Sequence, residues 1–365
     1  MIYLDHGATS FPKLPQVRQA VSDAMARCAN PGRGGHPASM AATRTVYRCR
    51  ERAAKLFGCK AEQVVFTSNC THGLNIAIRS LVKPGGRVLI SGFEHNAVVR
   101  PLYALGAQVT VAGRKLFDWE DTLSRFEDGL KQGVDAAVFT NASNVFGYVL
   151  PVGEMSALCR RYSVPFIVDA AQSAGTEEID LTAWGAAFVA MPGHKGLQGP
   201  MGTGLLLCGR QPDPLLYGGT GTESIRREMP DDLPERLEAG TLNVPGIAGL
   251  DTGLAYLQRT GIETIRRRES REAKRCAVGL GKLGLRVFAG PHQSGTVSFL
   301  APGGCEELGE ALARRGIAVR AGLHCAPLAH ESAGTLETGT VRVSFGVSNR
   351  PEDADRFLES LKPLL

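Results

Sequence analysis

The sequence predicts an α/β protein with a large, doubly wound and mostly parallel sheet domain and a smaller α+β domain at its C-terminal end. Two observations lead to this fold class. Short apolar runs alternate with amphipathic helical stretches over the first two thirds of the chain, and after about residue 245 a long helical region replaces the alternation. We expect the large domain over residues 15–245 and the small domain over 246–365, with residues 1–14 packing near the small one.

The large domain contains six apolar runs with the length and composition of buried strands. They cover residues 63–67, 87–91, 136–141, 165–170, 187–191 and 203–208. Between them, "THGLNIAIRSL" at 71–81 and "PVGEMSALCRRY" at 151–162 have helical spacing. Such alternation gathers ligands at the carboxyl ends of the strands. Residues 210–245 are rich in Gly, Pro and charge, which predicts an irregular connection.

The small domain begins with the long helical region, which reaches residue 283. Its strand candidates lie at 286–290, 295–301, 317–320 and 340–346. A predicted helix at 305–316 separates them, and a second helix at 351–365 closes the chain. This mixture of elements predicts an α+β arrangement.

The composition favours a globular enzyme and gives no sign of a nucleic-acid or membrane partner. The net charge is +5 over 365 residues, and the densest basic run, "IRRRESREAKR", is interleaved with Glu as on a solvated helix face. The start lacks a basic and apolar leader, and no apolar run reaches the ~18 residues of a membrane span. Nine scattered cysteines without a C-x-x-C pair predict free thiols, so we expect a cytoplasmic protein.

A lysine follows one predicted strand in the glycine-rich turn "MPGHKGLQGPMGTG". The glycines let the backbone approach a ligand closely, and desolvation would lower the pKa of the Lys195 amine. The alternative is an ordinary lysine of a surface turn.

Asp169 ends the predicted strand in "FIVDAAQSAG" and faces the same crevice as Lys195. A buried carboxylate needs a cationic partner, and a protonated pyridine nitrogen would be one. Alternatively, Asp169 caps the helix that follows it.

A polar turn joins strand to helix in "FTSNCTHGLN". The free backbone N–H groups and the Thr71 hydroxyl make a ready anion site, although Thr71 alone would also suit a helix cap. A helix cap does not explain why this cradle, Asp169 and Lys195 all lie at the carboxyl ends of different strands.

These motifs, in this order, resemble the class V aminotransferase family, whose members are fold type I enzymes dependent on pyridoxal 5'-phosphate (PLP). Within the family the resemblance is to cysteine desulfurases and selenocysteine lyases of the SufS-like group. Matching motifs run from "YLDHGAT" at the start to "TVRVSFGVSN" near the end, so the resemblance covers nearly the whole chain.

The resemblance implies catalytic roles for Lys195, which would form a Schiff base with the cofactor, and for His95 of "FEHNAVVRP", whose ring would stack on the pyridine. By itself, a loop histidine such as His95 is more often a turn or surface residue. Asp169 would bind the pyridine nitrogen. Asn144 and Gln172 would contact the cofactor's phenolic oxygen and the substrate.

The resemblance also assigns the cofactor phosphate to Cys70 and Thr71, with help from His194. Thr241 in "EAGTLN" matches a threonine that reaches the phosphate of a neighbouring subunit, which implies a homodimer. The chain departs from the family at Pro192, where a phosphate-binding serine is common, and at His72, where a glutamate is common.

The stretch "VRAGLHCAPL" is similar to the short loop that carries the desulfurase nucleophile, which would make Cys325 the third catalytic residue. A thiol needs help to ionise at neutral pH, and Arg320 and His324 are expected to favour the anion and to lie near the substrate. Arg342 matches an arginine that grips the substrate carboxylate through a bidentate pair, although it would also suit a structural ion pair.

Cys325 has two other possible roles. A buried structural thiol is one, because small cysteines are common in cores. A metal site in "HCAPLAHE" is the other, but the spacing fits no common zinc pattern and we expect no metal.

The sequence therefore predicts a PLP-dependent enzyme that converts L-cysteine to alanine, keeps the sulfur as a Cys325 persulfide and passes it to a small acceptor protein. Selenocysteine lyase is the first alternative, because both activities use this loop. A class V aminotransferase or epimerase with an incidental Cys325, and a non-enzymatic PLP-binding protein, are further alternatives. A nucleotide-binding protein is less consistent, because no G-x-G-x-x-G or P-loop motif follows a strand.

Overall fold

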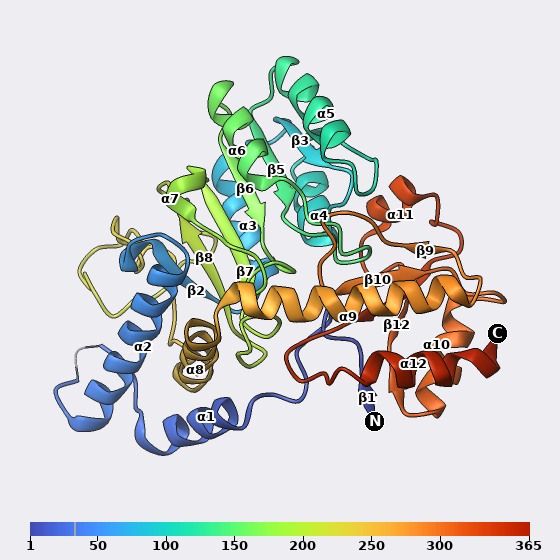
Figure 1. The fold of residues 1–365 in the computed structure, drawn as a ribbon. Helices are drawn as coiled ribbons and strands as arrows, with labels where there is room; N and C mark the ends of the chain where they lie inside the picture. Colours follow the sequence, from blue (N-terminus) through green and yellow to red (C-terminus); the bar gives the residue numbers. More distant parts are fainter. Residues whose placement is uncertain (33) are drawn as a thin grey trace.

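A seven-stranded sheet forms the centre of the computed structural model, which describes residues 1–32 and 34–365 (Figure 1). The strand order is β2-β8-β7-β6-β5-β3-β4. Its strands are β2 (Val64–Thr67), β3 (Arg87–Ser91), β4 (Gln108–Ala112), β5 (Ala136–Thr140), β6 (Phe166–Asp169), β7 (Phe188–Pro192) and β8 (Gly204–Cys208). Neighbours from β7 to β4 run parallel, whereas β8 is antiparallel to both β7 and β2.

Helices cover both faces of this sheet because its side chains alternate between two apolar cores. Val138 of β5 belongs to the core under α3 (Cys70–Leu81) and α4 (Asn96–Ala104). Its neighbours Ala137 and Phe139 face the other core. The helices contributing to that second core include α2 (Pro37–Leu56), α5 (Trp119–Lys131), α6 (Val152–Arg161), α7 (Leu181–Trp184) and α8 (Val244–Thr260). The sheet is therefore buried on both faces, as the continuous apolar strands predict.

A four-stranded antiparallel sheet, of order β12-β13-β10-β9, lies in the last third of the chain. Its strands are β9 (Val287–Phe288), β10 (Thr296–Phe299), β12 (Arg320–Gly322) and β13 (Thr340–Ser344). The helices of this part are α9 (Ile262–Lys282), α10 (Cys305–Arg314), α11 (Pro327–Ala333) and α12 (Asp353–Leu361), followed by the 3-10 turn η2 (Lys362–Leu364). A third apolar core fills the space between this sheet and α9, α10 and α12.

The N-terminal segment crosses to the C-terminal sheet, and both chain ends lie on that side of the molecule (Figure 1). Strand β1 (Ile2–Tyr3) pairs in parallel with β11 (Ile317–Ala318). Two helices follow, α1 (Pro15–Arg27) and α2, and both pack against α8; the 3-10 turn η1 (Ala61–Gln63) leads into β2. The domain boundary at residue 245 stays a prediction.

The predicted fold class is confirmed, and all six predicted strands of the large sheet are present within one or two residues. The prediction missed β4, a half-buried edge strand whose polar and apolar residues do not form a continuous run. It also joined two short strands into one at 317–320, and it overlooked the break at Gly261, whose φ of +84° separates α8 from α9. Among the described residues, no helix is long and apolar enough to cross a membrane.

Candidate active site

The side chains singled out at the strand ends come together at the carboxyl edge of the large sheet. Asp169 is the last residue of β6, and Lys195 lies three residues beyond the end of β7. They line one cavity of about 110 Å³. The other lining residues are Asn69, Cys70, Thr71, His95, Ala97, Thr140, Ala142, Asn144, Ala171, Gln172, Pro192 and His194. Most of the predicted cofactor-binding residues thus share one hollow.

Asp169 is buried, and only one of its carboxylate oxygens has protein partners. Oδ1 accepts a hydrogen bond from the Ala171 N–H at 2.9 Å and one from the Cys70 thiol at 3.5 Å. Oδ2 accepts none from the residues that the structure describes. Turns follow Asp169, and the next helix, α7, starts only at Leu181, so the alternative that Asp169 caps a following helix is wrong. The carboxylate has an oxygen available for a cationic group in the cavity.

Lys195 is a partly buried residue of the cavity wall and not a surface turn lysine. Burial lowers the pKa of its amine, and the positive charge of Arg342 lowers it further. No hydrogen bond to Nζ is found among the described residues. A lysine amine with a lowered pKa and no protein partner is suited to act as a nucleophile and as a base.

His95 ends the loop after β3 and caps α4. Its Nδ1 accepts a hydrogen bond from the Ala97 N–H at 3.0 Å, which fixes the ring and leaves the proton of the neutral imidazole on Nε2. Burial lowers the pKa of His95. The ring is therefore held as a neutral, oriented plane against the cavity.

The start of α3 presents backbone donors to the same hollow. Asn69 is the N-cap, because its Oδ1 accepts from the His72 N–H at 2.9 Å, so the alternative that Thr71 is the cap is wrong. The N–H groups of Cys70 and Thr71 make no hydrogen bond within the described residues. Burial raises the pKa of the Cys70 thiol well above its usual value, which keeps it neutral beside Asp169. Free N–H groups at a helix start favour an anion.

The two departures from the family pattern lie at the edge of this cradle. Pro192 ends β7 and lines the cavity without offering a donor. His72 places Nδ1 3.3 Å from the Ser68 hydroxyl, and its buried Nε2 has no partner among the described side chains. Burial lowers the pKa of His72, so the imidazole is neutral at physiological pH and adds no formal charge to the cradle.

His194 is fixed by the N-terminal segment. Its Nδ1 lies 3.1 Å from the Thr9 hydroxyl, and burial lowers its pKa to about 4. Its carbonyl accepts from Lys13 Nζ at 2.6 Å. Thr241 is exposed and is not among the residues that line this cavity.

Two amide side chains connect the cavity to other segments. Gln172 donates from Nε2 to the Gly7 carbonyl at 3.0 Å. Asn144 donates from Nδ2 to the His324 carbonyl at 2.8 Å, so it joins the cavity wall to the loop that carries Cys325.

Arg342 of β13 is 2% exposed and forms the structural ion pair that was one of its two interpretations. Its Nη2 donates to Asp5 Oδ1 at 2.8 Å, and its Nη1 donates to the Asn144 carbonyl at 2.8 Å. Its buried Nε has no acceptor among the described residues. Arg320 is more exposed and binds the same carboxylate, with Nη2 2.9 Å from Asp5 Oδ2. Asp5 therefore holds both arginines.

Cys325 is exposed, so the interpretation of a buried structural thiol is wrong. It lies in the turn between β12 and α11, where His324 and Cys325 have φ values of +54° and +56°. Such left-handed backbone is strained for residues other than Gly and needs support from its surroundings. The Cys325 carbonyl accepts from the Asn96 N–H at the start of α4 at 2.8 Å. The turn is thus tied to the large sheet's helices.

A second support for this turn is a chain of buried side chains. The His324 Nδ1 lies 3.5 Å from His330 Nε2, and the two rings are parallel within 8°. His330 Nδ1 lies 2.8 Å from the Thr335 hydroxyl, and His324 Nε2 lies 3.3 Å from the Arg320 carbonyl. Because that carbonyl can only accept, His324 donates from Nε2, His330 donates to His324, and Thr335 donates to His330.

The protonation states of these histidines bear on the environment of the thiol. Burial lowers the pKa of His324 to about 3 and that of His330 to about 4, so neither imidazole carries a charge at neutral pH. Arg320 shares the carboxylate of Asp5, which offsets its charge. A neutral His324 brings no positive charge to the thiol, and its Nε2–H is directed at the Arg320 carbonyl.

Sequence reasoning missed two buried acids. Asp5 lies inside the quoted "YLDHGAT", and the need of a buried Arg342 for a carboxylate was the signal that could have found it. Glu94 precedes His95; its Oε1 accepts from the Thr140 N–H at 2.9 Å and from the Ser91 hydroxyl. Burial raises the pKa of Glu94 to about 8, so its carboxyl group is mostly protonated at neutral pH.

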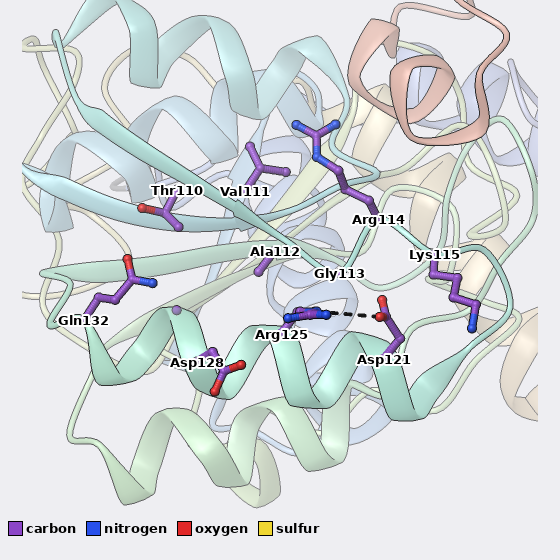
Figure 2. Close-up of a pocket in the computed structure, with 11 residues that line it drawn as sticks. Thr110, Val111, Ala112, Gly113, Arg114, Lys115, Asp121, Arg125, Asp128 and Gln132 are labelled. Atoms are coloured by element: carbon purple, nitrogen blue, oxygen red, sulfur yellow. Dashed lines mark ion pairs between the residues drawn. The ribbon is translucent and has the colours of Figure 1, made fainter.

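A larger cavity, of about 660 Å³, lies away from these residues between β4 and α5 (Figure 2). Arg125 and Asp121, which line it, pair with each other at 3.8 Å, and Lys115 pairs with Asp118 at 2.7 Å. None of the predicted site residues lines it. Cavity size therefore does not identify the chemical centre of this protein. The described part of the chain also holds no group of three or more side chains placed to bind a metal ion.

A lysine, a carboxylate and an anion cradle at the ends of parallel strands define an α/β enzyme that works with a bound, phosphate-bearing cofactor. The family model described as aminotransferase class-V matches residues 2–357. A probable cysteine desulfurase of Methanothermobacter thermautotrophicus is 31% identical over 100% of this chain and 94% of its own length, and one of Xylella fastidiosa is 30% identical over 99% and 90%.

Solved structures agree with these relatives. The apo structure of a cysteine desulfurase from Thermococcus onnurineus NA1 matches with a TM-score of 0.90 and 32% identity, covering 100% of this chain and 94% of that one. The cysteine desulfurase CsdA from Escherichia coli, in its S-sulfonic acid form, matches with a TM-score of 0.86 and 25% identity over 99% and 94%. The chain belongs to the class V aminotransferase family, and the predicted membership is confirmed.

The cavity fits PLP, the cofactor of this family. Asp169 offers a free carboxylate oxygen for a protonated pyridine nitrogen, and Lys195 offers an amine without a protein partner. The unbonded N–H groups of Cys70 and Thr71 suit a phosphate, and His95 presents a fixed ring to the hollow. The pyridine nitrogen, the phosphate and the ring face of the cofactor would thus each have a group of complementary chemistry in this cavity.

Proposed function

We propose that this protein is a PLP-dependent cysteine desulfurase that releases alanine from L-cysteine and keeps the sulfur on Cys325. The observation that carries the proposal is the place of the thiol. Cys325 lines a hollow that adjoins the cofactor cavity, because the two share Thr71, His95 and Ala97 in their walls. An exposed thiol beside a cofactor site is what sulfur transfer requires.

PLP, when bound, supplies an electron sink for bonds at the α carbon of an amino acid. Lys195 Nζ would remove a proton at that carbon and return one later, which its lowered pKa favours. Asp169 would keep the ring nitrogen protonated through its free oxygen. His95 would hold the ring plane in place.

Arg342 would bind the substrate carboxylate. Its buried Nε is the one donor of the guanidinium that lacks a partner among those named, while Nη1 and Nη2 are held by Asn144 and Asp5. A bidentate grip would therefore require one of these contacts to open. Asn144, Arg320 and Gln172 would complete the substrate's surroundings.

Cys325 would take the sulfur atom of the substrate. The carbon–sulfur bond of cysteine breaks and a sulfur–sulfur bond forms at Cys325 Sγ, so that one cysteine and one thiol become one alanine and one persulfide. No external oxidant or reductant is needed for this balance. An acceptor thiol would then remove the outer sulfur.

The proposal extends to the assembly. Thr241 is exposed and lies outside its own cavity, which supports a role at the phosphate of a second subunit in a homodimer. A small acceptor protein would receive the sulfur. All nine cysteines are free thiols, which suits a reducing, cytoplasmic compartment.

The test uses the PLP-loaded protein and L-cysteine. We expect alanine in solution and one additional sulfur atom on the peptide that contains Cys325, measured by mass spectrometry. Alanine formed without sulfur on Cys325, or no alanine at all, would contradict the proposal. Selenocysteine is run alongside, because comparable turnover of selenocysteine with negligible turnover of cysteine would identify a selenocysteine lyase instead.

A further inference from the structure

A cavity of about 390 Å³ lies where helices of the large sheet meet the C-terminal part of the chain. Its walls are the first turns of α5, α6 and α9, the turn after β5, and residues 176–178 and 292–293. None of its lining residues lines the cofactor cavity. This second cavity is called the junction cavity below.

The junction cavity lies on the face of the large sheet opposite to α3 and α4. Leu150 and Val152, which line it, belong to the apolar core under α5 and α6, whereas α3 and α4 cover the other core. The proposed homodimer brings Thr241 of one subunit to the phosphate cradle at the start of α3, on the far face of the sheet. That contact therefore does not cover the junction cavity.

Asn141, directly after β5, is a buried polar residue of the lining. Its neighbours Thr140 and Ala142 line the cofactor cavity, and Asn141 lines the junction cavity because successive side chains of an extended chain point to opposite faces. Asn141 is 4% exposed, and its Oδ1 has no hydrogen-bond partner among the described residues. A buried amide oxygen without a donor is costly, so Asn141 offers an acceptor to a ligand that carries N–H groups.

The charges around the junction cavity are mostly negative, because four glutamates and one arginine line it. Arg266 is held by Glu263 at 2.6 Å and lies 4.0 Å from Glu177. Glu154 and Glu178 are exposed and form no ion pair with the residues that the structure describes. Burial raises the pKa of Glu177 to about 7, and a cation beside it would favour the charged carboxylate. The excess of carboxylates favours a positively charged ligand.

Apolar surface lies between these carboxylates. Trp119 stacks on His292 with ring centroids 3.5 Å apart, and its Nε1 donates to the Val149 carbonyl at 2.8 Å. Trp184 and Ile262 also line the cavity. Methylene groups can pack on these side chains while ammonium groups reach the carboxylates and the aromatic faces. The volume is within the range of small-ligand sites, roughly 300–1,000 Å³.

We infer that the junction cavity binds a linear polyamine, with one ammonium group at Asn141 and others at the glutamates that surround it. The inference is independent of the proposed desulfurase activity, because the two cavities share no lining residue. Since α6 packs on the large sheet and α9 belongs to the C-terminal part, the polyamine bridges the two parts of the molecule.

The test is isothermal titration calorimetry of the PLP-loaded full chain with spermidine. We expect saturable binding of one spermidine per chain, which weakens as salt rises. An alkanediol of the same length should not bind. Acetyl-lysinamide, which carries a single ammonium group as a lysine of a partner protein would, should bind at least about tenfold more weakly. Equal affinity for spermidine and acetyl-lysinamide, or no saturable binding of spermidine, would overturn the inference.

The variant Glu154→Gln/Glu178→Gln should bind spermidine at least about tenfold more weakly than the unaltered protein. Glu337→Gln/Glu359→Gln is the matched control and should keep the affinity. It removes the same charge from two exposed glutamates that do not line the cavity and that form no ion pair within the described part of the chain. The same affinity in both double variants would show that spermidine binds elsewhere on the acidic surface and would contradict the inference.

Asn141→Leu tests the buried acceptor without changing the charge. We expect spermidine affinity to fall by about tenfold, because a charge-assisted hydrogen bond is lost. Circular dichroism checks that the variant is folded, and the glutamate variants decide the inference if it is not. Unchanged affinity in a folded Asn141→Leu protein would exclude an ammonium group at Asn141 and overturn the inference.

Discussion

The strand-end residues and the Cys325 turn face adjoining hollows, but different interactions hold them. Asp169 and Lys195 are fixed by β6 and β7, whose backbones pair within the large sheet. Cys325 lies in a strained turn of the C-terminal part, held by single contacts from Asn96, Asn144 and the buried histidines. We therefore expect the strand-end residues to be as stable as the sheet that carries them. The position of the Cys325 thiol depends instead on a few side-chain contacts.

Lys195→Ala alters the cofactor cavity at the strand ends and should have the largest effect on activity. We expect cysteine turnover to fall by about 10⁴-fold or more, because the base at the α carbon is lost. The visible absorption of bound PLP should change as well, whereas the circular dichroism of the fold should not. Lys115→Ala is the control; it removes an exposed lysine beside the other cavity and should leave turnover unchanged (Figure 2).

Cys325→Ser alters only the turn that carries the thiol. Turnover of cysteine to alanine should fall by at least roughly 10³-fold, because the hydroxyl is a poor acceptor of sulfur. The absorption spectrum of the bound cofactor should stay the same, since Cys325 lies outside the cavity's lining. Cys28→Ser, at the end of α1, is the control. Undiminished turnover of cysteine to alanine would remove the Cys325 thiol from the mechanism.

The pH dependence of folding stability tests the contribution of the buried histidines that support the Cys325 turn. Burial lowers the pKa of His330 to about 4, against about 6.5 in the unfolded chain. Below pH 6.5 the unfolded state therefore binds a proton that the folded state does not, and stability falls as the pH falls toward 4. Between pH 7 and 5 this single group should account for at most about 2 kcal/mol.

His330→Gln checks this expectation, because glutamine can donate to His324 and accept from Thr335 but does not titrate. Urea unfolding should show a smaller loss of stability from pH 7 to pH 5 in the variant than in the unaltered protein. The same slope in both proteins would mean that His330 does not contribute to the acid sensitivity.

Thr335→Val should have the smallest effect. It removes the hydroxyl that donates to His330 Nδ1 at 2.8 Å, at a cost of about 1 kcal/mol in unfolding free energy. Hydrogen exchange in the turn around Cys325 should increase, and exchange in β6 and β7 should not. Thr338→Val, at an exposed threonine nearby, is the control and should change neither quantity. An equal increase of hydrogen exchange in the Cys325 turn and in β6 and β7 would contradict the proposed difference between these two regions.

The strands and the strand-end residues were predicted well because they depend on patterns of neighbouring residues. Apolar runs such as 136–141 and 165–170 marked strands, and Asp169 and Lys195 could be placed because a residue that ends a parallel strand lies at a known edge of the sheet. Strand β4 escaped prediction because an edge strand is only half buried and so lacks a continuous apolar run.

The contacts between distant segments had no such pattern. Asp5 meets Arg342 across 337 positions of the chain, and Asn144 meets His324 across 180. The neutral state of His324 follows from burial, which the sequence "GLHCAP" does not report. For the same reason, the exposure of Cys325 could not be predicted from its neighbours in the sequence.

The fold class, the family and the residues at the strand ends could be predicted without a structure, because strand periodicity and motif order are properties of neighbouring residues. Which charges are already paired, which histidines are neutral and whether the Cys325 thiol is exposed could be seen only in the folded chain. Those properties depend on burial and on groups brought together from remote parts of the chain.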